Sequence, residues 1–208
     1  MKIMCYGDSN TWGYIPNING YSKNAIMQQY KECECWWYDL MQQHEVIING
    51  LCGRCIAHEN RWLRNRNANQ TIYDDLQEHC HLDLIILQLG TNDCKTEYND
   101  SAKDIVNNLE NLIAKIKPLA ENIAIICPPT IYEDSPITSK YYVGAQSKSK
   151  QLNKLYKNLA EKNNLVFISG TDLDIGEDGE HLSTYGHQQL KSRVNEAVTN
   201  LFFNAVLE

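Results

Sequence analysis

Residues 84–89 read Leu-Ile-Ile-Leu-Gln-Leu, a nearly uninterrupted apolar run. A continuous run of this length is typical of a strand that is covered on both faces, as in a parallel sheet. Four other short apolar runs lie along the chain. They are Lys2–Tyr6, Val46–Asn49, Ile123–Cys127 and Val166–Ser169. Together with residues 84–89, these runs predict five strands.

Segments with helical periodicity separate these runs. Ser101 is a good N-cap, and apolar residues then recur every three or four positions until Pro118 closes the helix. Two further helices are expected, one around residues 152–159 and one over residues 183–202. Alternation of strands and helices predicts a parallel sheet with helices on both faces. The longest irregular stretch, Pro128–Gly144, is interpreted as a loop that borders the functional site.

Length and composition indicate one globular domain over residues 1–208, with 43% hydrophobic and 22% charged residues. The net charge of −7 argues against a nucleic-acid partner, because phosphate binding needs clustered basic residues. No apolar run approaches the roughly 18 residues of a membrane span. The N-terminal apolar segment is too short for the core of a signal peptide, so we expect a cytoplasmic location with the eight cysteines reduced.

Polar residues with catalytic potential follow four of the five predicted strands. In open parallel sheets, ligands bind beyond the carboxyl ends of the strands. These four segments contain a serine, a close-approach glycine, an amide side chain and an Asp–His pair, which together make up the set that acyl transfer requires. In chain order they are Gly7-Asp8-Ser9, Gly53, Gly90-Thr91-Asn92-Asp93 and the loop with Asp178 and His181.

Each of these residues has a predicted role. Ser9 is the candidate nucleophile, and His181 is the base that takes its proton. Asp178, three residues before His181, is placed to orient the imidazole and to stabilise its charged form. The backbone N–H groups of Ser9 and Gly53 and the side-chain amide of Asn92 are the candidate oxyanion hole.

Other residues near these segments have structural interpretations. Asp8 is expected to accept hydrogen bonds from loop N–H groups, and Asp93 to act as a helix cap. Trp12 is expected to line the substrate pocket. His187 is expected in the first turns of the terminal helix as a satisfied structural residue. Four further histidines have no matching context, namely His44, His58, His79 and His81.

The four segments resemble the blocks of the SGNH (GDSL-type) hydrolase family, and the longer strings 7–14 and 82–93 resemble its arylesterase-like branch. The resemblance implies a flavodoxin-like three-layer α/β/α sandwich with a five-stranded parallel sheet, and no metal or organic cofactor. One departure is visible. The second block in this branch usually reads Gly-Leu-Ser-Gly-Arg-Thr, whereas Cys52 and Cys55 stand here in place of the Ser and Thr.

The expected function is hydrolysis of small-molecule carboxylic esters with short acyl groups through an acyl-Ser9 intermediate, with acyl transfer to alcohols open to the same intermediate. A carbohydrate O-acetyl esterase or a lysophospholipase-type lipase would use the same residues. Outside this class, Cys52 and Cys55 could serve a thiol oxidoreductase, and Gly7–Gly13 a flavin or phosphate ligand. Zinc binding that adds Cys33 and Cys35 to that pair is disfavoured by their one-residue spacing. A homo-oligomer is also compatible with the sequence.

Overall fold

The computed structural model describes residues 1–20, 26–79 and 81–205. Its centre is a sheet of five strands in the order β2-β1-β3-β4-β5, and all neighbouring pairs are parallel. All five predicted strands are confirmed. Their bounds are β1 Lys2–Gly7, β2 Glu45–Gly50, β3 Leu82–Gln88, β4 Ala120–Ile126 and β5 Val166–Ile168.

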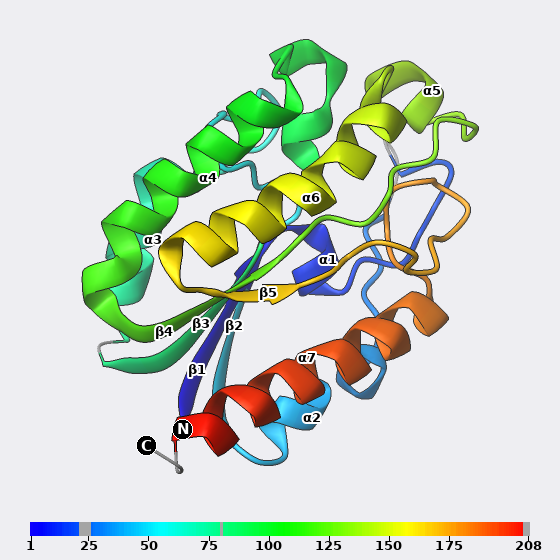
Figure 1. Cartoon of the computed structure of the whole chain (residues 1–208). Coiled ribbons are helices and arrows are strands. Elements are labelled where there is room, and N and C mark those ends of the chain that lie inside the picture. The colour runs from blue at the N-terminus through cyan, green and yellow to red at the C-terminus, as the bar shows by residue number, and fades with distance from the viewer. Residues whose placement is uncertain (21–25, 80, 206–208) are drawn as a thin grey trace.

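Helices cover both faces of the sheet, which gives the expected three-layer α/β/α sandwich (Figure 1). One layer holds α3 Ala68–Gln77, α4 Ala102–Ile116 and α6 Ala145–Asn163. The opposite layer holds α2 Tyr38–Met41 and α7 Thr184–Ala205. The remaining helices are short. They are α1 Ser9–Trp12, α5 Thr138–Tyr141 and the 3₁₀ turns η1 Glu32–Glu34, η2 Asn92–Cys94, η3 Thr96–Tyr98 and η4 Lys117–Leu119.

Each strand contributes to two cores because successive side chains point to opposite faces of a sheet. From β1, Met4 and Tyr6 pack under α3, α4 and α6, whereas Ile3 and Cys5 pack against α2 and α7. The inner strands β3 and β4 alternate in the same way. Burial on both faces explains why these strands appear as continuous apolar runs in the sequence.

Helix α4 begins and ends where its sequence predicts. The Ser101 hydroxyl accepts a hydrogen bond from the Asp104 N–H at 3.2 Å, and the Asp104 carboxylate accepts one from the Ser101 N–H at 2.9 Å. This reciprocal capping satisfies two N–H groups that have no partner inside the helix. Pro118 lies in the 3₁₀ turn that follows the last residue, Ile116.

Four α-helices are absent from the sequence prediction. Helices α1 and α2 are single turns in segments for which no helix was expected, and the other two are α5 and α3. Helix α5 interrupts Pro128–Gly144, which was expected to be irregular throughout. Helix α3 buries only Ala68, Ile72 and Leu76, a stripe of one residue per turn, so its periodicity is weak. In both cases tertiary packing, rather than a strong amphipathic pattern, stabilises the helix. No helix in the described part of the chain is long and apolar enough to cross a bilayer.

The position of Ser9 at the edge of the sheet depends on a close approach between α1 and β2. A Cβ atom at Gly50, the last residue of β2, would lie 2.4 Å from the backbone nitrogen of Trp12. Only glycine allows α1 to rest directly on this strand end. Since α1 begins with Ser9, Gly50 fixes the height of that serine above the sheet.

Candidate active site

Ser9, His181 and Asp178 form a continuous chain of hydrogen bonds. Ser9 Oγ lies 2.7 Å from His181 Nε2, and His181 Nδ1 lies 2.8 Å from Asp178 Oδ2. Ser9 is the first residue of α1, which follows β1 after a single residue. Asp178 and His181 lie in the loop between β5 and α7. All three side chains are buried. Ser9 and His181 are 172 residues apart in the sequence, and the fold brings them into contact.

The Asp178 carboxylate is held by four donors. Oδ1 accepts hydrogen bonds from the backbone N–H groups of Glu180 and His181, at 3.2 and 3.1 Å. Oδ2 accepts from the Asn17 N–H at 3.1 Å in addition to the His181 ring. Burial raises the pKa of Asp178, but the His181 ring and these N–H groups outweigh it and leave the pKa below its usual value. The group is therefore a carboxylate at neutral pH.

The pKa of His181 is raised above its usual value. Burial of the ring lowers the pKa, whereas the charges of Glu180, Asp178 and Asp8 and the hydrogen bond to Asp178 raise it and prevail. The imidazolium form is thus favoured by three carboxylates. This is the property that a base needs when it must hold a proton between two steps of a reaction.

The turn after β1 fixes the backbone of Ser9. The Asp8 side chain accepts a hydrogen bond from the Asn10 N–H at 2.9 Å and so caps α1, as its expected role as an acceptor requires. Burial raises the pKa of Asp8 to about 6. The Asn10 side chain links this turn to the loop that carries Asp178 and His181, because its oxygen accepts a hydrogen bond from the Leu182 N–H at 2.9 Å.

The three donors that the sequence predicts for an oxyanion hole follow three adjacent strands of the sheet, β1, β2 and β3. Within the described residues, the backbone N–H groups of Ser9 and Gly53 donate no hydrogen bond. The Asn92 side-chain amide donates one N–H to the Arg54 carbonyl at 3.1 Å, which orients the amide, and its second N–H has no acceptor among the residues that the structure describes. Gly53 has φ +79°, in the left-handed region that favours glycine, so its N–H direction depends on this residue type.

Arg54 is a structural residue that sequence reasoning missed. Its guanidinium is fully buried, donates to the carbonyls of Gly7 and Asn49, and stacks 3.8 Å above the centroid of the Tyr6 ring. It therefore ties the ends of β1 and β2 to the loop that carries Gly53. The basic residue count gives no signal for this, because Arg54 stands alone among neutral residues.

The predicted loop Pro128–Gly144 does border the site, because it contacts three consecutive residues of the loop that carries Asp178 and His181. Ser135 Oγ donates to the Asp178 carbonyl at 2.6 Å, and the Tyr132 N–H donates to the Gly179 carbonyl at 2.9 Å. The Tyr142 hydroxyl donates to the Glu180 carboxylate. Of these, Glu180 and Tyr142 are buried polar groups that the sequence did not single out.

The Trp12 side chain lies one ring away from the candidate base. The Tyr14 ring is 4.4 Å from the His181 ring between centroids, and Trp12 is 6.4 Å from Tyr14. Trp12 is partly exposed, whereas Trp36 and Trp37 are buried in the core. This arrangement is compatible with the expectation that Trp12 forms part of the substrate pocket.

A comparison with protein families identifies the chain. The model of the GDSL-like lipase/acylhydrolase family matches residues 5–189. The chain belongs to this family. As a GDSL-like acylhydrolase it is a carboxylic ester hydrolase. No match was found among curated protein sequences.

Solved structures place this GDSL-like acylhydrolase in the arylesterase-like branch. A carbohydrate acetylesterase from Sinorhizobium meliloti is 27% identical, with a TM-score of 0.86 over 96% of this chain and 99% of that one. The native aryl esterase of M. smegmatis has the same identity, TM-score and coverage. A lipase/acylhydrolase from Enterococcus faecalis is 21% identical and shares the fold, with a TM-score of 0.70 over 96% of this chain and 95% of that one.

The cysteine pair of the acylhydrolase lacks the properties of a redox site. Burial raises the pKa of Cys52 to about 12 and that of Cys55 well above its usual value, and both thiols are free. A thioredoxin-like cysteine has a lowered pKa, because the thiolate is the reactive form. These two residues therefore argue against the thiol oxidoreductase alternative.

Two histidines differ from what their sequence context predicts. His187 is fully buried, as expected, but neither ring nitrogen has a hydrogen-bond partner in the described part of the structure, so the expectation of a satisfied residue is wrong. It packs edge-on against Tyr30 at 5.2 Å, and burial lowers its pKa to about 3. His58, which had no sequence context, pairs with Asp100 at 2.7 Å and stacks on Tyr98.

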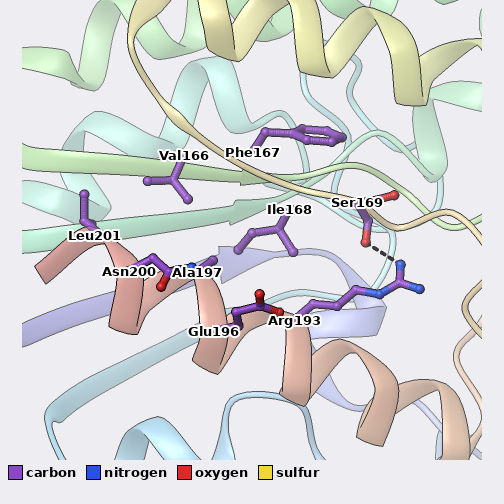
Figure 2. A pocket seen from close by; sticks show the side chains of 9 residues that line it. All are labelled: Val166, Phe167, Ile168, Ser169, Arg193, Glu196, Ala197, Asn200 and Leu201. Atoms are coloured by element: carbon purple, nitrogen blue, oxygen red, sulfur yellow. Dashed lines mark hydrogen bonds between the residues drawn. The ribbon is translucent and has the colours of Figure 1, made fainter. Parts of the chain in front are cut away.

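A surface depression of about 570 Å³ lies away from the triad, between β5 and α7 (Figure 2). Ile168 and Leu201 line it, and Arg193 donates to the Ser169 carbonyl at 2.8 Å on one side of it. Ser9, Asp178 and His181 do not belong to its lining. The depression is therefore separate from the candidate active site.

Proposed function

We propose that Ser9, His181 and Asp178 are the catalytic triad of this esterase and that the enzyme hydrolyses carboxylic esters with short acyl groups. The observation that carries this proposal is the hydrogen-bond chain of 2.7 and 2.8 Å through the His181 ring. A serine hydroxyl gains nucleophilicity when an oriented imidazole can take its proton.

In the first half of the reaction, Ser9 Oγ attacks the ester carbonyl carbon while its proton moves to His181 Nε2. The negative charge that develops on the carbonyl oxygen is stabilised by the free N–H groups of Ser9, Gly53 and Asn92. His181 then gives its proton to the leaving alcohol oxygen, and the carbon–oxygen bond breaks. The product is an acyl-Ser9 ester.

In the second half, a water molecule attacks the acyl-Ser9 carbonyl and gives its proton to His181. Return of that proton to Ser9 Oγ releases the carboxylic acid and restores the enzyme. An alcohol in place of water would give a new ester, which makes acyl transfer a second outcome of the same intermediate. Asp178 remains ionised throughout, because its role is to stabilise the imidazolium.

The substrates that we propose are small esters of aryl or carbohydrate alcohols. The two structural relatives described as an aryl esterase and a carbohydrate acetylesterase support this choice. The aromatic wall of Tyr14 and Trp12 beside His181 would accommodate a flat or ring-shaped alcohol group. The unit of function is a single domain that spans residues 1–208.

A fluorophosphonate probe tests the nucleophile directly. Wild-type protein should be labelled and should hydrolyse p-nitrophenyl acetate, and Ser9→Ala should lose both properties. Ser139→Ala, which removes an exposed serine hydroxyl, is the matched control and should behave like wild type. Labelling that persists in a folded Ser9→Ala variant would show that the proposed nucleophile is wrong.

A further inference from the structure

Glu180 is a buried carboxylate beside the triad that the mechanism above does not use. Its side chain is 2% exposed and lies immediately before His181 in the sequence. One carboxylate oxygen accepts the Tyr142 hydroxyl, and the other has no hydrogen-bond partner among the described residues. Burying a carboxylate with one oxygen unsatisfied is costly, so this position calls for an explanation.

The surroundings of Glu180 hold the side chain in one place. Its backbone N–H donates to Asp178 Oδ1 at 3.2 Å, the same oxygen that binds the His181 N–H. Tyr142, which supplies the hydroxyl, is fully buried at the end of α5. The Lys95 ammonium lies 5.7 Å from the centroid of the Tyr142 ring. The carboxylate is therefore held by Tyr142 in the protein interior, on the residue next to His181, and is not free to turn to solvent.

Charge on Glu180 acts on His181 through a medium from which water is excluded. The charge of Glu180 favours the charged imidazolium, together with the charge and the hydrogen bond of Asp178 and the charge of Asp8. Two unit charges interact far more strongly in a buried site than in water. Glu180 thus complements Asp178, which contacts the ring directly.

We propose that Glu180, held by Tyr142, is a positioning residue that stabilises the imidazolium of His181 during both proton transfers. This inference rests on the proposed role of His181 as the base. Because the proton resides on His181 when the tetrahedral intermediate forms and again when water attacks, a second fixed carboxylate lowers the free energy of both steps.

Several other groups face His181 and must be separated from Glu180 in any test. Asp178 shares its loop, Ser9 and Tyr14 approach from α1 and the segment after it, and His187 lies on α7. Tyr14 has a pKa raised by burial to about 12 and His187 one lowered by burial to about 3, so neither titrates near neutral pH.

Two further groups lie close to this cluster. Asp8 has a pKa raised by burial to about 6, so it titrates close to the range of interest. Cys52, whose pKa is raised by burial to about 12, also senses the charge of Glu180. Both groups are present in wild type and in every variant below. Because the charge of Glu180 also raises the pKa of Asp8, the change in the His181 midpoint measures the net effect of removing the Glu180 charge.

The decisive variant is Glu180→Gln, which keeps the shape of the side chain and its ability to accept the Tyr142 hydroxyl. Glu177→Gln is the matched control, because Glu177 is an exposed carboxylate in the same loop. In each protein, NMR titration of the His181 ring measures its midpoint without reference to activity. The pH dependence of kcat/KM for p-nitrophenyl acetate measures the same group during catalysis.

In Glu180→Gln, we expect both midpoints to fall by about one pH unit and kcat/KM at high pH to fall by about three- to tenfold. Glu177→Gln should match wild type. A loss of activity with both midpoints unchanged would overturn the proposal, since a merely structural role predicts that result. The two proposals can also fail separately. If the NMR midpoint of His181 falls in Glu180→Gln but the activity of wild type does not depend on Ser9, the proposed function is wrong while the electrostatic effect of Glu180 on His181 stands.

A second variant tests the role of Tyr142 and guards against misfolding of the first. Tyr142→Phe keeps the Glu180 carboxylate and removes only the hydroxyl that binds it. Loss of this donor releases the Glu180 side chain from its fixed position, so the His181 midpoint should move in the same direction as in Glu180→Gln by a smaller amount. A midpoint equal to that of wild type would show that Tyr142 does not hold the charge of Glu180.

Discussion

At the scale of single residues, the Asp178 carboxylate controls both the ring and the backbone of His181. One oxygen binds the ring nitrogen at 2.8 Å, and the other binds the backbone N–H of His181 at 3.1 Å. The imidazole therefore cannot rotate without breaking a charge-assisted hydrogen bond. This geometry explains how a spacing of three residues is sufficient to build an oriented Asp–His pair.

The first prediction concerns the side chain of Asn92. Asn92→Ala removes the only side-chain donor of the proposed oxyanion hole, and its Arg54 contact shows that the amide is already oriented. We expect kcat for p-nitrophenyl acetate to fall by about 10²–10³ while the fold is kept. Circular dichroism provides the folding control. A loss of only twofold would remove Asn92 from the oxyanion hole.

The second prediction concerns the pH dependence that titration of His181 gives to kcat/KM. The neutral imidazole is the base, so kcat/KM must rise with pH as the ring loses its proton. Because the pKa of the buried ring is raised by the nearby carboxylates, the midpoint should lie above the unperturbed value of about 6.5. A pH–rate profile between pH 5 and 9 measures it. A rate that is flat over this range would contradict a histidine base.

At the scale of elements, Arg54 joins pieces that the sheet alone leaves separate. Its guanidinium binds backbone carbonyls at the ends of β1 and β2 and lies 3.9 Å from Asp75 of α3. Gly53 and the carbonyl that orients Asn92 are therefore anchored through one buried side chain. The loop that carries the proposed oxyanion hole gains rigidity from this contact.

The third prediction concerns the stability lost when Arg54 is replaced. Arg54→Met keeps an unbranched side chain and removes the hydrogen bonds to Gly7 and Asn49. The two Asn49 oxygens then lose the guanidinium as a donor, and the Gly7 carbonyl keeps the Leu51 N–H. We expect the free energy of unfolding in urea to fall by roughly 2–4 kcal/mol. Arg61→Met removes an exposed ion pair to Glu97 and should change it by less than about 1 kcal/mol. Equal effects in the two variants would contradict the role of Arg54.

At the scale of the whole molecule, the strand order β2-β1-β3-β4-β5 decides which segments meet. It places β1 between β2 and β3, so the segments with Ser9, Gly53 and Asn92 follow three adjacent strands. Helix α7 then returns across the other face, and the loop before it carries His181 back to Ser9 (Figure 1). The packing of α7 therefore links overall stability to the active site.

The fourth prediction concerns His187 on α7 and the dependence of stability on pH. Its folded-state pKa of about 3 lies below the value of about 6.5 in the unfolded chain. The unfolded state therefore takes up a proton below pH 6.5 that the native state excludes, and stability is lost as the pH falls. His187→Phe cannot titrate and keeps an aromatic ring against Tyr30.

Urea denaturation of both proteins at pH 7 and pH 5 measures this effect. Wild type should lose about 2 kcal/mol more than His187→Phe between the two pH values, because the unfolded histidine is mostly charged at pH 5. Comparison across pH within each protein removes any constant effect of the larger ring. The same loss in both proteins would show that His187 does not contribute to acid sensitivity.

The sequence by itself determined the five-stranded sheet and the short polar segments that follow four of its strands. Each of the five strands is a local apolar run, and the ends of four of them carry short polar motifs, so neighbouring residues are enough to recognise them. Helix α4 was equally predictable, because Ser101 and Pro118 mark its ends. The weak stripe of α3 and the single turn of α5 were not, since their stability comes from packing against the rest of the chain.

Only the tertiary structure decided which buried polar groups support the site. Glu180 and Tyr142 are 38 residues apart, and Arg54 lies 47 residues from the Gly7 carbonyl that it binds. Nothing in the local pattern of either segment specifies the partner. The unsatisfied ring of His187 was likewise invisible, because hydrogen-bond satisfaction depends on all the elements that surround a group. Local motifs fix the chemistry that a chain can offer, whereas the electrostatics of burial depend on contacts that exist only in the folded molecule.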